Sequence, residues 1–106
     1  MTETSIFAIR LREARKARGV SQKQLGILAG VDEFVASARL NQYERGKHTP
    51  DLNIAERLAR ELGVPMSYLF EPEEDLATLI LLLGRLSGKQ RQNLIKQLRG
   101  ETPEAG

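Results

Sequence analysis

The sequence predicts an all-α protein in which five helices are followed by two more. Apolar residues recur at helical spacing through most of the 106 residues, whereas alternating β-branched runs are lacking. Ser or Asp precedes several of these periodic segments and Gly follows them, as is typical of helix beginnings and ends. The hydrophobic content of 41% is enough for one small core.

Local sequence signals indicate where the first two helices begin and end. The first is expected over residues 6–18, with Gly19 as its stop and an apolar stripe formed by Phe7, Leu11 and Ala14. Ser21 and Gln24 form a capping box for the second helix, which Gly30 closes. The expected apolar face of the second helix consists of Leu25, Leu28 and Ala29.

Three further helices complete the first section. The third is expected to end at "YERG", where Gly46 is the stop signal. Pro50 and Asp51 begin the fourth, because the Asp51 carboxylate can accept hydrogen bonds from the first free amides. The fourth helix has a stripe made of Ile54, Ala55, Leu58, Ala59 and Leu62. Gly63 ends it, and a short fifth helix follows over residues 65–70.

The acidic segment "EPEED" separates a second helical section from the first. "LATLILLLGRL" is apolar almost all round and should be covered on more than one side, and Ser87 with Gln90 caps the helix after it. The predicted organisation is a domain over residues 1–71, a helical extension over residues 72–99 and a flexible tail over residues 100–106.

The extension carries more apolar surface than a thin helical hairpin can bury. We interpret it as a dimerisation surface, and the alternative is that both helices fold back on the domain. The residues expected to make the dimer contacts are Leu76, Leu79, Ile80, Leu83, Leu94 and Leu98.

Charge is unevenly spread, although the net charge is only +2. Residues 1–50 contain nine Lys or Arg against five Asp or Glu, giving +4, and residues 51–106 contain seven against nine, giving −2. A basic front half is compatible with a polyanionic partner or with ordinary surface charge.

Several classes of function are not expected from this composition. There is no Cys, and the single His48 has no carboxylate pair at ligand spacing nearby, so neither a metal nor another cofactor is predicted. The sequence contains neither a Ser/His/Asp arrangement nor a glycine-rich phosphate loop, so an enzyme is not predicted. No signal peptide is visible, and the run "LATLILLLG" is shorter than the ~20 residues that span a bilayer. We therefore expect a cytoplasmic protein without a membrane partner.

The third helix has two chemically different sides. Residues are about 100° apart on a helix, so Ala36, Leu40 and Tyr43 define a buried side and Glu44 lies near it. The opposite side presents Ala38, Asn41, Gln42 and Arg45, with Arg39 at its flank. Amide side chains can pair with adenine, Arg with guanine, and Ala with a thymine methyl group in the major groove of DNA. The alternative is an ordinary solvated polar face.

The segments "SQKQLGILAGV" and "NQYERGKHTPDLNIAERLARELGVPMSYLF" resemble the Cro/phage-repressor-type (XRE) DNA-binding domains, from about Phe7 to Phe70. The resemblance implies a five-helix lambda-repressor-like helix-turn-helix domain that binds double-stranded DNA sequence-specifically. It further implies a transcriptional regulator, a dimeric repressor that reads an inverted repeat with its third helix, with half-sites ~34 Å apart. The base-reading residues are then Ala38, Arg39, Asn41 and Gln42.

The resemblance also assigns supporting roles. Arg15 and Glu44 should form an internal ion pair, and Gln22 should hydrogen-bond a phosphate at the start of the second helix. The turn after the third helix supplies further phosphate contacts, namely Arg45, Lys47, His48 and Thr49. Arg10 and Arg12 are weaker phosphate candidates, and a solvated helix face explains them equally well.

The segment before the third helix departs from the family pattern. Twelve residues separate "AGV" from "ERG" where the family has about eight, a gain of roughly one helical turn. Either Asp32 caps a longer helix that begins near Glu33, or the turn is longer, Phe34 and Val35 plug the core and Ser37 caps a normal helix. We favour the longer turn. Gly26, where the family usually has Ala, allows a closer helix contact.

Two other functions fit the same domain. It could be an antitoxin that neutralises a toxin protein and represses its own operon, with the extension as the toxin-binding surface. It could also be a protein-interaction module that has lost DNA binding, although the basic face speaks against this.

Overall fold

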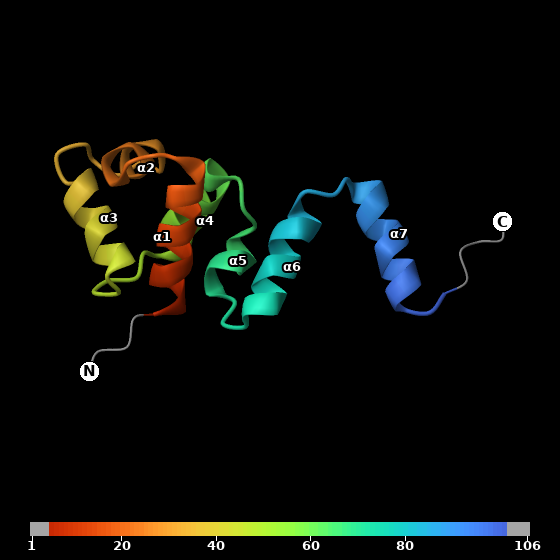
Figure 1. Ribbon diagram of the computed structural model, residues 1–106. Coiled ribbons are helices and arrows are strands. Elements are labelled where there is room, and N and C mark those ends of the chain that lie inside the picture. The colour runs from red at the N-terminus through yellow and green to blue at the C-terminus, as the bar shows by residue number, and fades with distance from the viewer. Residues whose placement is uncertain (1–4, 102–106) are drawn as a thin grey trace.

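The computed structural model describes residues 5–101 and is all-helical over that range, as predicted. Its helices are α1 (Ile6–Arg18), α2 (Gln22–Leu28), α3 (Ala36–Glu44), α4 (Leu52–Leu62), α5 (Met66–Phe70), α6 (Glu74–Gly84) and α7 (Gly88–Leu98). The molecule is elongated, with extents of 58 × 32 × 23 Å. Figure 1 shows α1–α5 gathered at one end, with α6 beside α5 and α7 standing apart at the other end.

Local signals set the helix ends. The Ser21–Gln24 and Ser87–Gln90 capping boxes both form, and the Asp51 carboxylate accepts a hydrogen bond from the backbone N–H of Ile54 at 2.9 Å. The predicted bounds of α1 are confirmed, and Gly19 stops it in the left-handed conformation (φ 77°), which costs glycine little. The sequence reading missed the Ser5 hydroxyl, which caps α1 by accepting from the Ala8 N–H at 3.1 Å.

The core of α1–α5 is built around five fully buried leucines, one from each helix: Leu11, Leu25, Leu40, Leu58 and Leu69. The stripes predicted for α1 and α4 face this core, where Phe7, Ala14 and Ala59 also pack. Leu28 is a correction, because it is 55% exposed. On the short helix α2 it lies outside the arc that holds Leu25, Gly26 and Ala29, the residues that are buried on this helix and at its end.

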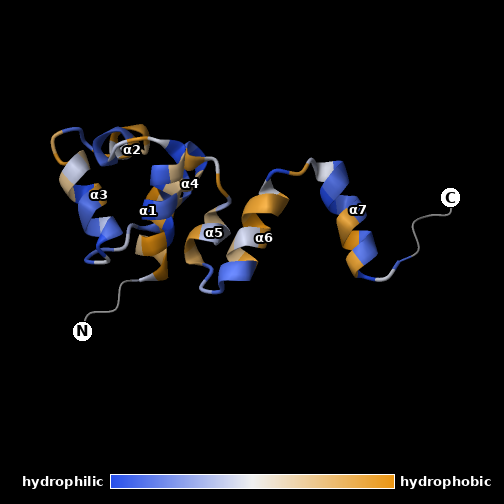
Figure 2. Ribbon diagram, viewed as in Figure 1, coloured by the Kyte–Doolittle hydropathy of each residue, from blue (hydrophilic) through white to orange (hydrophobic). Residues whose placement is uncertain are grey.

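The rear helices are far less buried. In α6 only Ala77 is buried, and Ile80 and Leu81 pack partly against the core. In α7 no residue is buried. The expectation that α6 is covered on more than one side is wrong within one chain, because Leu76, Leu79 and Leu82 are 42–50% exposed. Figure 2 shows the apolar composition of α6 in orange. Within residues 5–101 no helix is long and apolar enough to cross a membrane.

The predicted tail over residues 100–106 is only partly described. Gly100 and Glu101 still donate backbone hydrogen bonds to carbonyls at the end of α7, at 3.0 and 2.9 Å. Residues 102–106 lie outside the described residues, so the flexibility of the tail stays a prediction.

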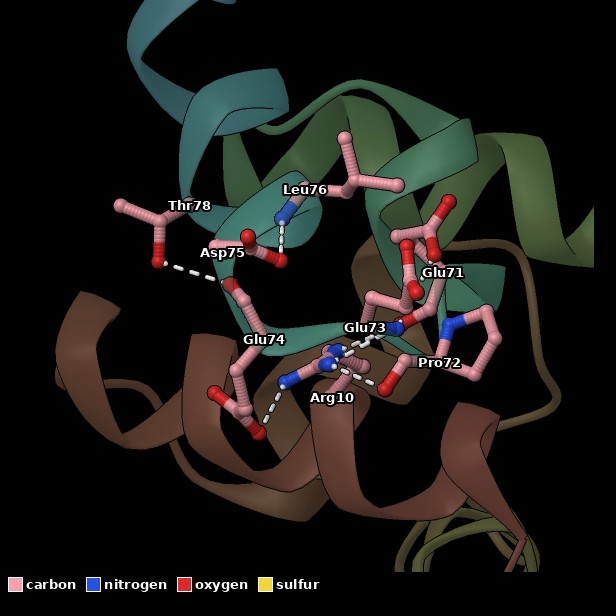
Figure 3. Close-up of polar contacts among 8 residues, drawn as sticks. All are labelled: Arg10, Glu71, Pro72, Glu73, Glu74, Asp75, Leu76 and Thr78. Carbon is pink, nitrogen blue, oxygen red and sulfur yellow. Dashed lines mark hydrogen bonds and ion pairs between the residues drawn. The ribbon is translucent and has the colours of Figure 1, made fainter.

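Arg10 joins the two sections, and the expectation of a phosphate contact or a solvated position for it is wrong. Its side chain is 2% exposed, and its guanidinium donates to the Glu71 carbonyl oxygen at 2.9 and 3.1 Å and to the Glu74 carboxylate at 3.0 Å (Figure 3). It also lies 5.6 Å from the ring centroid of Tyr68. Burial raises the pKa of Tyr68, Glu13 adds to the rise, and Arg10 opposes it. Arg10 thus fixes the start of α6 to α1.

Candidate nucleic-acid interface

Helices α2 and α3 pack directly against each other, and Gly26 permits this contact. A Cβ atom at Gly26 would lie 2.8 Å from Leu40 Cδ2 and 2.9 Å from Ala36 Cβ, closer than real side chains approach. The absence of a side chain at this position therefore lets α3 lie directly against α2. The predicted closer helix contact at Gly26 is present.

The segment between α2 and α3 forms the longer turn, and α3 has nine residues. The Asp32 carboxylate accepts from the Phe34 N–H at 2.8 Å, and the Asp32 carbonyl accepts from the Val35 N–H at 3.1 Å, so Asp32 caps the turn rather than a helix. Two details of the favoured arrangement are wrong. Phe34 is 90% and Val35 42% exposed, so neither plugs the core, and Ser37 lies inside α3 while Val35 occupies the cap position without a side-chain cap.

The buried and exposed sides of α3 are those predicted from the spacing of residues on a helix. Ala36, Leu40, Tyr43 and Glu44 are buried, whereas the predicted base-reading residues Ala38, Arg39 and Asn41 are exposed. Gln42 is half-buried, and it lies with Arg39, His48 and Thr49 along a hollow between α3 and the start of α4. The structure thus brings Arg39 and Gln42 together with two of the predicted phosphate contacts.

The predicted internal ion pair is present between α1 and the end of α3. Arg15 Nε and Nη2 donate to the two Glu44 carboxylate oxygens at 2.5 and 3.0 Å, and Arg15 Nη1 donates to the Val20 carbonyl oxygen at 3.0 Å. The side chains are 14% and 3% exposed. The hydrogen bond to Glu44 raises the pKa of the Arg15 guanidinium, although burial opposes the rise. A two-pronged contact of this kind fixes the angle of α3.

Gln22 links this ion pair to the exposed side of α3, a connection that the sequence reading missed. Its Nε2 donates to Glu44 Oε1 at 3.1 Å and to Asn41 Oδ1 at 3.4 Å. The predicted phosphate-binding amide at the start of α2 is therefore held beside a predicted base-reading residue. One signal was available: Gln22 and Asn41 occupy the facing ends of two helices that the helix-turn-helix pattern packs together.

The remaining phosphate candidates follow α3 in one turn. Arg45, Lys47, His48 and Thr49 are all exposed. The Gln42 carbonyl oxygen accepts from the backbone N–H of Lys47 at 3.0 Å and of His48 at 3.4 Å, which holds this turn against the end of α3. Over residues 5–101, no group of three or more His, Cys, Asp or Glu side chains could hold a metal ion. The chemistry available at this surface is hydrogen bonding and positive charge.

The residues predicted to make the dimer contacts differ in exposure. Leu76, Leu79 and Leu98 are exposed, and Leu83 and Leu94 are half-buried. Ile80, which belonged to the same predicted set, packs partly against the core. The rear surface lies on a different part of the molecule from α2 and α3 (Figure 1).

Comparisons with known proteins agree with this arrangement. The helix-turn-helix family model matches residues 11–69. The chain is 27% identical over 96 residues to the cryptic phage CTXphi transcriptional repressor RstR of Vibrio cholerae, covering 84% of this chain and 81% of that protein. It also matches the crystal structure of the transcriptional regulator BswR, with a TM-score of 0.81 and 48% identity, over 88% of this chain and 92% of that one. The chain therefore belongs to the XRE-type helix-turn-helix family of DNA-binding transcriptional regulators.

Proposed function

We propose that this regulator is a repressor that binds an inverted repeat as a dimer, with one α3 in each of two successive major grooves. The observation that supports it best is the two-sided α3. Its inner side is locked by the Arg15–Glu44 pair, and its outer side presents Ala38, Arg39 and Asn41 to solvent. A helix held on one side and polar on the other suits direct readout of base edges.

The base contacts divide by chemistry. Arg39 is proposed to pair with guanine, Asn41 and Gln42 with adenine edges, and Ala38 to touch a thymine methyl group. Gln42 lies beside His48 and Thr49, so a base contact and phosphate contacts would come from one continuous surface. This continuity supports Gln42 as a base contact.

The phosphate contacts are proposed at both ends of the interface. Gln22 lies at the first position of α2, where free backbone amides favour an anion. Arg45, Lys47, His48 and Thr49 lie in the turn after α3 and would meet the other strand. Because Gln22 donates to Asn41 and Glu44 in the free protein, binding a phosphate would require its amide to exchange partners.

Selection of duplexes from a random DNA pool at about 0.15 M salt tests the proposal. Enrichment of an inverted repeat with half-site centres ~34 Å apart is the expected result. Recovery of a single, unrepeated half-site would contradict dimeric reading. Lack of any enrichment would contradict sequence-specific reading and would favour the antitoxin function, in which the rear helices hold a toxin.

Two substitutions then separate base reading from phosphate binding. Gln42→Ala should lower the affinity for the best site by ~1–3 kcal/mol and relax the preference at one base position. Lys47→Ala should weaken binding to every duplex and reduce the salt slope by about one unit. Gln92→Ala and Lys89→Ala on α7 are matched controls that should bind as the wild type does. Uniform weakening by Gln42→Ala, or an unchanged slope for Lys47→Ala, would remove that residue from its assigned role.

A further inference from the structure

Helix α6 has an apolar face that its own chain leaves open. Successive helical residues are about 100° apart, so four leucines of α6 share an arc of about 120° that lies opposite the buried Ala77. They are Leu76, Leu79, Leu82 and Leu83, and three of them are 42–50% exposed. We call this arc the leucine face. A continuous exposed apolar surface of this kind marks a contact with another molecule.

Helix α7 has a matching stripe and no partner for it. Leu94, Ile95 and Leu98 fall within an arc of about 100°, and Ile95 is 39% and Leu98 78% exposed. The helix has only 11 residues and buries none of them. An isolated helix of this length is marginal in water, so α7 requires tertiary contacts to be stable.

A hydrogen-bonded corner joins α6 to α7. Arg91 Nη1 donates to the Leu86 carbonyl oxygen at 2.9 Å and to the Leu83 carbonyl oxygen at 3.4 Å. These bonds and the Ser87–Gln90 capping box fix the first turn of α7 against the end of α6. Figure 1 shows α7 standing away from α6 beyond this corner.

The charges of the two helices are complementary. The start of α6 carries Glu74 and Asp75, whereas α7 carries Lys89, Arg91 and Lys96 and no acid, and Arg99 follows it directly. Asp75 lies at the acidic end of the leucine face, and Arg99 lies about 40° beyond Ile95 at the end of α7. Within the described residues the ion pair of Arg99 is with Glu101 at 3.6 Å, and both side chains stay largely exposed. A helix α7 running antiparallel along α6 would place Arg99 beside Asp75.

We propose that α7 of each copy lies antiparallel on the leucine face of α6 in a second copy, so that two chains exchange their last helices. The inference rests on the dimer of the proposed function and specifies how it forms. A second copy is the occupant because one chain carries both halves of the contact, the acidic-ended leucine face and the basic-ended stripe. In a two-fold symmetric dimer, α7 of each copy covers α6 of the other, so both leucine faces are covered at once. A single helix from a different protein would cover the leucine face but leave α7 without a partner.

Disulfide mapping tests the exchange directly, since the chain has no Cys of its own. A disulfide needs Cα atoms within about 4.4–6.8 Å. Asp75→Cys and Arg99→Cys chains are mixed and oxidised, and a covalent heterodimer is expected to form faster than either homodimer. Arg60→Cys, exposed on α4, replaces Asp75→Cys as the control and should give no such crosslink with Arg99→Cys. No preference for the 75–99 crosslink would overturn the exchange.

A chain that carries both cysteines distinguishes exchange from hairpin closure. The exchanged dimer predicts that Asp75→Cys/Arg99→Cys chains are linked covalently in pairs. A bridge within a single chain would show that α7 closes on its own α6 and would overturn the proposal.

Sedimentation gives a second readout that needs no crosslink. Leu79→Glu should yield a monomer in which α1–α5 stay folded, because Leu79 is 50% exposed and lies on the leucine face, outside the core of α1–α5. Leu52→Glu, at a 68% exposed leucine of α4, is the control and should remain a dimer. A dimeric Leu79→Glu chain, or a monomeric wild type, would overturn the exchange.

DNA binding separates this result from the proposed function. A monomeric Leu79→Glu chain that still selects one half-site would support both proposals. An exchanged dimer without selective DNA binding would leave the exchange intact and remove the proposed function.

Discussion

Helices α4 and α6 have the same length, 11 residues each, yet they differ in how the chain uses their apolar side chains. Helix α4 buries four residues, Ala55, Leu58, Ala59 and Leu62. Helix α6 is richer in leucine but buries only Ala77. The number of apolar residues therefore does not determine burial, because a side chain is buried only where another element covers it. The front of the molecule buries its apolar side chains within one chain, whereas the rear leaves many of its apolar side chains exposed.

The two ion pairs that involve α1 show the same difference. In the Arg15–Glu44 pair both side chains are nearly buried, so each charge depends on the other. In the Arg10–Glu74 pair Arg10 is buried but Glu74 is 82% exposed. Glu74 can be solvated without Arg10, so Arg10 acts mainly through the Glu71 carbonyl oxygen. The first pair holds the DNA-binding surface, and the second attaches the rear helices.

The largest expected contrast is between two Leu→Ala substitutions. Leu58→Ala should lower the free energy of unfolding by about 4 kcal/mol, because it opens a cavity in the core. Leu82→Ala, at a 49% exposed position of α6, should change it by less than about 0.5 kcal/mol in the monomer. Urea unfolding at low protein concentration measures both values. Equal losses would show that the rear helices are packed within one chain.

The next effect is expected at the buried ion pair. Glu44→Ala leaves the Arg15 charge nearly buried without its partner and should cost about 3 kcal/mol. Glu56→Ala breaks the exposed Glu56–Arg60 pair of α4 and serves as the control, with a loss below about 1 kcal/mol. Thermal or urea unfolding compares the two variants. A similar small loss for both would mean that Arg15 and Glu44 do not fix α3.

A smaller effect is expected where the two regions join. Arg10→Met should cost about 2 kcal/mol, because the Glu71 carbonyl oxygen loses its buried donor. Amide hydrogen exchange should become faster in α6, while α4 keeps its protection. Arg12→Met, an exposed neighbour on α1, is the control. Unchanged exchange in α6 would show that Ala77 and Ile80 alone attach the rear helices.

The smallest effect is expected in the turn before α3. Phe34→Ala should change the free energy of unfolding by less than about 0.5 kcal/mol, because the ring is 90% exposed. Phe7→Ala is the comparison. It removes a buried ring from the core of α1–α5 and should lower the free energy of unfolding by about 3–5 kcal/mol. A loss above about 1 kcal/mol for Phe34→Ala would restore the arrangement in which Phe34 plugs the core.

Much of the interface could be predicted from the sequence, because its two-sided helix is a local property. The positions of Leu40, Tyr43 and Glu44 on one side follow from helical geometry alone. The Arg15–Glu44 pair was predicted from the family resemblance. The link from Gln22 to Asn41 was missed, because it depends on how closely α2 and α3 approach over Gly26.

By itself, the sequence determined the all-helical class and those helix ends that carry a capping side chain or a glycine stop. Caps and stops act through hydrogen bonds within about four residues, so Ser21, Asp51 and Gly63 can be read without knowledge of the fold. Only the tertiary structure decided which side chains are covered. Arg10 shares a face with Phe7 and Ala14, yet its partner Glu71 lies 61 residues away. Phe34 is apolar, yet no element covers it, and α7 lies away from α6 (Figure 1). Burial depends on neighbours that remote parts of the chain supply, and a local pattern does not contain them.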